Sequence, residues 1–324
     1  MMRLRTMLAA GAALMLASQP VLAAPRSIEM AVRGPDGPLA GTLLIAETPN
    51  APVVLILPGS GPTDRDGNSA LGLSANSYRL LAEALAERGL SSARIDKRGV
   101  GGSKEAAANP NKVTTDDYAA DTANWVRAIR DKTGRDCVWL AGHSEGGLVA
   151  LTAADGPGVC GLVLIAAPGR ALDVVMREQL DANPANAPLL ADAHRAIDAL
   201  KAGTPIDVTG MHPALAQGLF NPAVQDYLID LFRRDPAALI ASTGKPVLII
   251  TGLSDIQVAA ADGEALAAAN PKARLVRIAG MTHALKIAAS DDRAANVATY
   301  TNPSLPIAAE LVDAITGFIA PKPD

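Results

Sequence analysis

Short apolar runs alternate with helical patterns from residue 53 to the end of the chain, and this alternation limits the possible folds more than any other feature. Continuous apolar runs are typical of strands that are covered on both faces. Strands that alternate with helices form a mostly parallel sheet with helices on both sides. Two earlier runs are joined by the turn sequence R-G-P-D-G-P, which predicts an antiparallel hairpin. The expected class is therefore α/β, with a mostly parallel eight-stranded sheet whose strands are residues 27–32, 39–47, 53–57, 91–95, the run from Cys137 to the G-H-S-E-G turn, 161–166, 246–251 and 273–278. The main predicted helices are residues 75–88, 115–132, 256–270 and 305–319.

The first 23 residues have the pattern of a secretory signal peptide. Arg3 and Arg5 precede an apolar stretch, and V-L-A then gives a small-residue cleavage site before Ala24. The apolar stretch, residues 7–17, is shorter than the roughly 20 residues of a membrane-spanning helix. We therefore expect an exported protein, periplasmic or secreted, with no stable insertion in a membrane.

One segment of the remaining chain breaks the alternation. Residues 24–168 and 245–324 form the predicted core, whereas residues 169–244 hold helical patterns separated by Pro, Gly and Asn. Parallel sheets bind ligands outside the carboxyl ends of their strands, and long insertions at that edge usually shape the binding site. We expect residues 169–244 to form a helical cap. The alternative is a surface excursion with no part in binding.

The chain has two cysteines, each at the start of a predicted strand. If the strands of Cys137 and Cys160 are parallel neighbours, the two side chains lie at the same end of the sheet. Export would then allow a disulfide in an oxidising compartment. The alternative is a pair of buried thiols that pack as small apolar groups.

A candidate nucleophile lies in the sequence G-H-S-E-G at residues 142–146. A serine between a strand and a helix is forced into a sharp turn, so its hydroxyl stands clear of the backbone. Side chains at Gly142 or Gly146 would collide with the neighbouring strand or helix in so tight a turn. Because G-x-S-x-G also occurs by chance, the strand before Ser144 and the helix after it make the stronger argument.

A serine hydroxyl becomes a good nucleophile when a histidine, itself held by a carboxylate, takes its proton. His283, in G-M-T-H-A-L, follows the last predicted strand and is the predicted base. His143 is expected to pack or form hydrogen bonds beneath the turn, and His194 and His212 fall in the predicted cap.

The orienting carboxylate is expected to follow another strand. Asp255 comes directly after the strand at residues 246–251 and is the predicted acid. Its alternative role is a helix N-cap. Asp173 is the second candidate, and Asp262, within a predicted helix, is a poor one.

Backbone N–H groups are expected to stabilise the oxyanion of the reaction. One is the N–H of Glu145, at the start of a helix. The other is the N–H of Ser60 or Gly61 in the loop P-G-S-G-P-T-D-R-D-G-N. That loop lacks the lysine of a phosphate-binding fingerprint. The Glu145 side chain itself is expected to be a solvated charge.

These motifs resemble the α/β-hydrolase superfamily over the mature chain apart from the cap. D-K-R-G-V-G-G-S at residues 96–103 also fits, with Asp96 and Arg98 expected to order their loop by pairing and to have no chemical role. Within the superfamily the chain is similar to bacterial carboxylesterases near the dienelactone-hydrolase-like and serine-aminopeptidase-like members. Such proteins usually carry His-Gly in the oxyanion loop, where this chain has Pro58.

The resemblance implies a serine carboxylesterase that acts on a small-molecule ester through Ser144, His283 and Asp255 and needs no cofactor, and the leader pattern adds the expectation of export. The scattered histidines and the lack of an H-E-x-x-H sequence predict no metal site. A net charge of −4 without a basic run argues against nucleic-acid partners, and an aromatic content of 3% argues against a sugar-stacking surface. A peptidase, a thioesterase and an acyltransferase with the same triad remain alternatives, as does a non-catalytic binding protein on this fold. The sequence does not indicate an oligomeric state.

Overall fold

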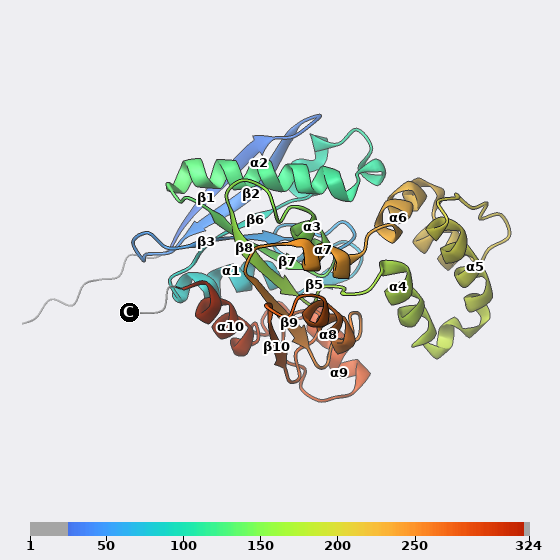
Figure 1. Ribbon diagram of the computed structural model, residues 1–324. Coiled ribbons are helices and arrows are strands. Elements are labelled where there is room, and N and C mark those ends of the chain that lie inside the picture. The colour runs from blue at the N-terminus through green and yellow to red at the C-terminus, as the bar shows by residue number, and fades with distance from the viewer. Residues whose placement is uncertain (1–24, 321–324) are drawn as a thin grey trace, which may run out of the picture.

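The computed structural model describes residues 25–320, and the predicted signal peptide at residues 1–23 lies outside the described residues. Its centre is an eight-stranded sheet with the strand order β1-β2-β6-β3-β7-β8-β9-β10 (Figure 1). β2 pairs antiparallel with β1 and with β6, and every other neighbouring pair in this sheet is parallel. The predicted α/β fold with a mostly parallel sheet is confirmed. The strands are β1 (Arg26–Arg33), β2 (Pro38–Ile45), β3 (Val53–Leu57), β6 (Ser91–Ile95), β7 (Val138–His143), β8 (Val159–Ile165), β9 (Val247–Gly252) and β10 (Arg274–Ile278).

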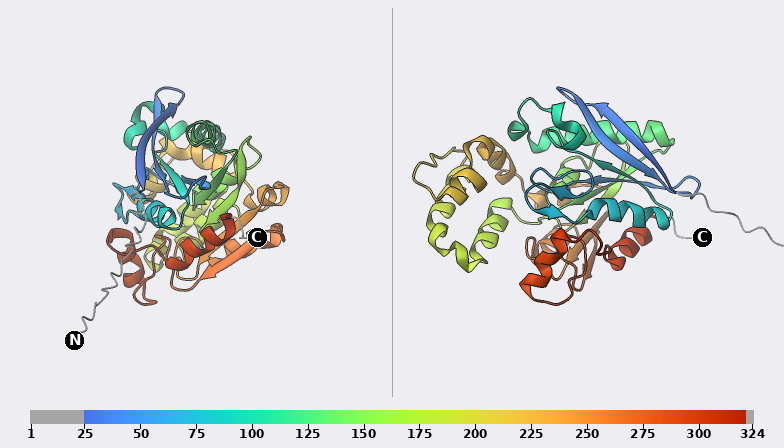
Figure 2. Two further views of the ribbon diagram at one scale, coloured as in Figure 1. Left: turned by 90° about the vertical axis from the view of Figure 1, so that its left-hand side faces the viewer. Right: turned by 180° about the vertical axis from the view of Figure 1, so that it is seen from behind.

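Different helices cover the two faces of the sheet, because successive side chains of a strand point to opposite faces. In β3, Val53, Leu55 and Leu57 belong to an apolar cluster with residues of α2 and α3. Val54 and Ile56 belong to a second cluster with residues of α1 and α10. All five side chains are buried, which explains the continuous apolar run in the sequence. Figure 2 shows these helices on both sides of the sheet. The helices of this core are α1 (Ser77–Glu87), α2 (Thr115–Thr133), α3 (Glu145–Thr152), α7 (Pro236–Ser242), α8 (Ala260–Ala269), α9 (Arg293–Ala298) and α10 (Ala309–Ile319).

The predicted helix starts at Ile256, but α8 begins later, at Ala260. The cause is the Asp255 carboxylate, whose Oδ1 accepts the N–H groups of Gln257 and Val258 and holds the chain in a turn. α10 also begins later than predicted, after the proline of S-L-P, because the residue before a proline avoids the helical conformation. Elements that the sequence did not indicate are α7, α9, the hairpin of β4 (Asn68–Ser69) and β5 (Leu73–Ser74), and the short helices Gly101–Ala106, Pro110–Lys112, Pro184–Leu189, Ala214–Leu219 and Thr299–Thr301. The short helix Pro222–Val224 lies within a helical pattern of the predicted cap.

The chain between β8 and β9 is helical and largely separate from the sheet. α4 (Leu172–Asp181), α5 (Leu190–Lys201) and α6 (Gln225–Phe232) lie together to one side of the core, as Figure 1 and the right view of Figure 2 show. Their apolar side chains form a cluster around Ile197 and Phe220, which also includes Leu148 of α3. α7, which also falls within residues 169–244, packs instead against α3 and α8 of the core. We call α4–α6 the helical cap. None of the helices within residues 25–320 is both long enough and apolar enough to cross a membrane.

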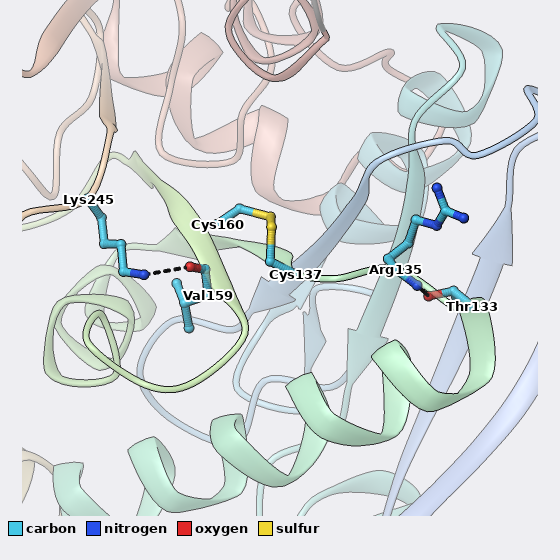
Figure 3. The surroundings of a disulfide bond; sticks show 6 residues. All are labelled: Thr133, Arg135, Cys137, Val159, Cys160 and Lys245. Carbon is cyan, nitrogen blue, oxygen red and sulfur yellow. Dashed lines mark hydrogen bonds between the residues drawn. A yellow bond between two sulfur atoms is a disulfide. The ribbon is translucent and has the colours of Figure 1, made fainter.

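A disulfide joins Cys137 and Cys160 at the amino ends of β7 and β8 (Figure 3). The bond closes a loop with a sequence separation of 23, which contains α3. Closing a loop of this size contributes about 3 kcal/mol through the entropy of the unfolded chain. Beside it, the Lys245 Nζ donates a hydrogen bond to the Val159 carbonyl at 2.9 Å. Ser144 follows the opposite end of β7, so the disulfide lies away from the candidate site.

Candidate active site

Ser144 occupies a strained turn between β7 and α3. Its φ of 53° and ψ of −126° are unfavourable for a residue with a side chain, and such strain is typical of functional positions. A Cβ at Gly142 would collide with the Gly146 carbonyl, and a Cβ at Gly146 would collide with the Leu57 carbonyl of β3. The two glycines therefore allow the strand and the helix to approach closely enough to expose the serine.

Asp255 and His283, which are 28 residues apart, meet at the carboxyl edge of the sheet. Asp255 follows β9 and His283 follows β10. The His283 Nδ1 donates to the Asp255 Oδ2 at 2.7 Å, and the exposed fractions of the two side chains are 8% and 1%. The other oxygen, Oδ1, is held by the N–H groups of Gln257 and Val258. The carboxylate is thus fixed on both sides and presents one oxygen to the imidazole.

Two cavities meet at Ser144. The first, of about 320 Å³, is lined by Ser144, His283 and Tyr300, and we call it the histidine-side cavity. The second, of about 600 Å³, reaches from Ser144 to the helical cap, and we call it the cap cavity. Ser60 and Gly61 border both cavities. The predicted nucleophile, base and oxyanion loop therefore share one space.

His143 lies beneath the turn, as expected, and joins two parts of the site. Its Nε2 is 3.0 Å from the His283 carbonyl, which can only accept, so Nε2 carries the proton. Its Nδ1 then accepts the Tyr78 hydroxyl at 2.8 Å, while the Tyr78 oxygen accepts the Gly59 N–H at 3.0 Å. Burial, with the nearby His283 ring, lowers the pKa of His143 well below its usual value, so the ring is neutral. This network connects the oxyanion loop to the loop of His283.

The predicted oxyanion donors lie around Ser144. The Gly59 N–H is already bound to Tyr78, whereas the N–H groups of Ser60 and Gly61 have no hydrogen-bond partner among residues 25–320. Glu145 is the first residue of α3, where helix N–H groups lack intrahelical partners. A Cβ at Gly59 would lie 3.2 Å from the Ser144 Cβ, so the loop passes directly against the serine.

The expectation of a solvated Glu145 side chain was wrong. The side chain is 4% exposed, because α6 of the cap covers it. Its Oε1 accepts the Tyr227 hydroxyl at 2.5 Å and lies 4.0 Å from the Lys97 Nζ. Burial, followed by the Glu145 charge, raises the pKa of Tyr227 well above its usual value. The sequence held no signal for this contact, because it depends on how the cap docks on the core.

The two other candidate carboxylates are bound elsewhere. Asp173 accepts from the Lys201 Nζ at 2.5 Å, which joins α4 to α5. Asp262, with 0% exposure, accepts from the N–H of Gly169 and from the Arg170 guanidinium. Asp173 therefore stabilises the cap, and Asp262 stabilises the junction between the core and the cap.

The sheet order and the helices on both of its faces define the class of fold: the chain has the α/β-hydrolase fold. The family model described as Serine aminopeptidase, S33 matches residues 70–204, a stretch that includes Ser144 and ends before Asp255 and His283. The chain is 27% identical over 215 residues to Esterase EstD of Thermotoga maritima. That match covers 66% of this chain and 48% of the relative, so it spans about half of the relative's length.

Solved structures show the same fold. An α/β serine hydrolase of Xanthomonas campestris, described as lacking a lid, is similar with a TM-score of 0.51 and 18% identity over 92% of this chain and 97% of that one. An esterase of Exiguobacterium antarcticum is similar with a TM-score of 0.52 and 19% identity over 79% of this chain and 92% of that one.

Proposed function

We propose that the protein is a serine hydrolase that cleaves carboxylic esters, with Ser144 as nucleophile, His283 as base and Asp255 as orienting acid. The observation that carries the proposal is the 2.7 Å hydrogen bond from His283 to Asp255. His283 borders the same cavity as the strained Ser144. The 27% identity with an esterase supports the ester as substrate class.

The proposed reaction has two halves. His283 takes the proton of Ser144 while the serine oxygen attacks the ester carbonyl, and the N–H groups of Glu145 and of Ser60 or Gly61 bind the resulting oxyanion. The C–O bond to the alcohol then breaks, and His283 returns the proton to that alcohol. Water, deprotonated by the same ring, attacks the acyl-enzyme and releases the carboxylic acid and the free serine. Asp255 keeps the proton on Nδ1 and stabilises the charged imidazolium.

The two cavities indicate how an ester is oriented. The leaving alcohol must lie near the ring that protonates it, which favours the histidine-side cavity for the alcohol. The cap cavity then receives the acyl chain, and its apolar lining from the cap includes Leu172, Met176, Leu219 and Leu228. A volume of about 600 Å³ accommodates short and medium acyl chains.

A peptidase is the second candidate, because the family model carries that description. An aminopeptidase needs an anion for the substrate's free amine. Glu145 is the buried carboxylate beside the nucleophile, but it already faces Lys97 and binds Tyr227. Because its charge is compensated within the protein, the site favours esters over peptides with a free amine.

A labelling and substrate panel tests the proposal. We expect a fluorophosphonate probe to label Ser144, and p-nitrophenyl esters from acetate to octanoate to be hydrolysed with a higher kcat/KM than aminoacyl p-nitroanilides. Peptide mapping identifies the labelled serine. Anilide cleavage at a rate equal to that of ester cleavage would favour the peptidase. Faster cleavage of thioesters would favour a thioesterase, and faster acyl transfer to added alcohols would favour an acyltransferase. Absence of both label and turnover would indicate a binding protein.

We also propose export to the periplasm or medium. The leader pattern of residues 1–23 supports it, as does a disulfide, which is stable in oxidising compartments. N-terminal sequencing of the protein from an extracytoplasmic fraction is expected to begin at Ala24, with Cys137 and Cys160 alkylated only after reduction. A cytoplasmic protein that keeps Met1 and has two free thiols would contradict export.

A further inference from the structure

Lys97 is a buried lysine that neither the predicted triad nor the predicted oxyanion donors explain. It follows β6 in the D-K-R-G sequence and is 8% exposed. Its Nζ donates to the Gly59 carbonyl at 2.7 Å, and the Glu145 carboxylate lies 4.0 Å away. Burial of an ammonium group is costly unless strong partners compensate it. The position of Lys97 is therefore best understood through the carbonyl that it binds.

The residues on either side of Lys97 hold the backbone in place. The Asp96 carboxylate accepts from the Arg65 guanidinium at 2.8 and 3.0 Å. Arg98 donates to Asp121 at 2.6 and 2.9 Å. Asp96 and Arg98 thus each pair with a residue elsewhere in the fold rather than with each other, and these contacts hold the loop. The lysine side chain enters the site from a loop that is fixed on both sides.

The carbonyl that Lys97 binds belongs to the peptide unit that supplies a proposed oxyanion donor. Every peptide bond within residues 25–320 is trans. The Gly59 carbonyl and the Ser60 N–H therefore lie in one plane and point in opposite directions. Tyr78 holds the Gly59 N–H on the other side of the same residue. With its carbonyl held by Lys97, the unit can direct the Ser60 N–H only away from the lysine.

We propose that Lys97 is a positioning residue that sets the Gly59–Ser60 peptide so that the Ser60 N–H binds the oxyanion. This inference rests on the proposed ester hydrolysis. A charged donor forms a stronger hydrogen bond than a neutral one, and polarisation of the carbonyl makes the attached N–H a better donor. Burial lowers the pKa of Lys97, and the Glu145 carboxylate opposes this shift and favours the charged form.

The test replaces the ammonium group and then restores it. Lys97→Met keeps most of the stem and removes the donor, and we expect kcat for a p-nitrophenyl ester to fall about 10²-fold with little change in KM. Inhibition by a trifluoromethyl ketone, whose adduct carries an oxyanion, is expected to weaken in parallel. Lys245→Met is the matched control, because it also removes a lysine–carbonyl bond but lies beside the disulfide, and we expect wild-type kinetics.

Rescue separates the hydrogen bond from packing. The two native cysteines are bonded to each other, so the thiol of a Lys97→Cys variant can be alkylated selectively. Treatment with 2-bromoethylamine restores an ammonium at the lysine length and is expected to recover activity, whereas bromoethane, which adds a neutral chain, is not. The rescue also serves if Lys97→Met does not fold. Unchanged kcat in a folded Lys97→Met variant, a change in KM alone, or equal rescue by bromoethane would overturn the inference. A wild-type protein without ester turnover or Ser144 labelling would instead overturn the proposed function.

Discussion

Replacement of Ser144 by alanine is expected to lower kcat/KM for p-nitrophenyl esters by about 10⁶-fold and to abolish fluorophosphonate labelling. The variant loses the oxygen that forms the acyl-enzyme. The strained φ of 53° at this residue remains in the variant, so the fold is expected to change little. Steady-state kinetics and intact mass after labelling measure both effects.

Ser242→Ala is a matched control for this variant. Ser242 ends α7, its hydroxyl donates to the Leu239 carbonyl at 2.9 Å, and it borders neither cavity. We expect its kinetics and labelling to resemble those of the wild type. If Ser144→Ala retained substantial turnover in a preparation free of contaminating esterase, or if the probe reacted at another serine, the assignment of the nucleophile would be wrong.

The sequence predicted the parts of the fold that depend on short-range patterns. The run V-V-L-I-L predicted a strand buried on both faces, and it is β3. The contact between Asp255 and His283 could also be predicted, because each residue follows a strand and parallel strands end at a common edge of the sheet. The start of α8 was misplaced because the Asp255 turn competes with the helix.

Contacts that depend on side-chain direction between distant elements could not be predicted. The Tyr78–His143 bond joins residues 65 positions apart, and the Tyr227–Glu145 bond spans 82 positions and requires the docked cap. The Lys97–Gly59 bond joins the loops that follow the neighbouring parallel strands β3 and β6. Lys97 lies between two charged residues in the sequence, and nothing in that pattern indicates that its ammonium group binds the Gly59 carbonyl.

Asp255→Asn is expected to lower kcat for ester hydrolysis by about 10⁴-fold, whereas Asp173→Asn is expected to leave it little changed. Asp173 was the second candidate in the sequence, and it is bound to Lys201 of the cap. Its substitution is therefore expected to act on the stability of the cap, seen as a lower melting temperature, rather than on the rate of the chemical step. Kinetics and thermal unfolding of both variants, measured side by side, test this difference.

The large effect of Asp255→Asn follows from how the carboxylate is held. Its Oδ1 accepts two backbone N–H groups, those of Gln257 and Val258, so the amide oxygen of an asparagine takes that place. The amide nitrogen then faces the His283 Nδ1, and two N–H donors cannot share that contact. The imidazole must carry its proton on Nε2, where it cannot accept the proton of Ser144. Near-wild-type kcat in Asp255→Asn together with a large loss in Asp173→Asn would assign the orienting role to the other carboxylate.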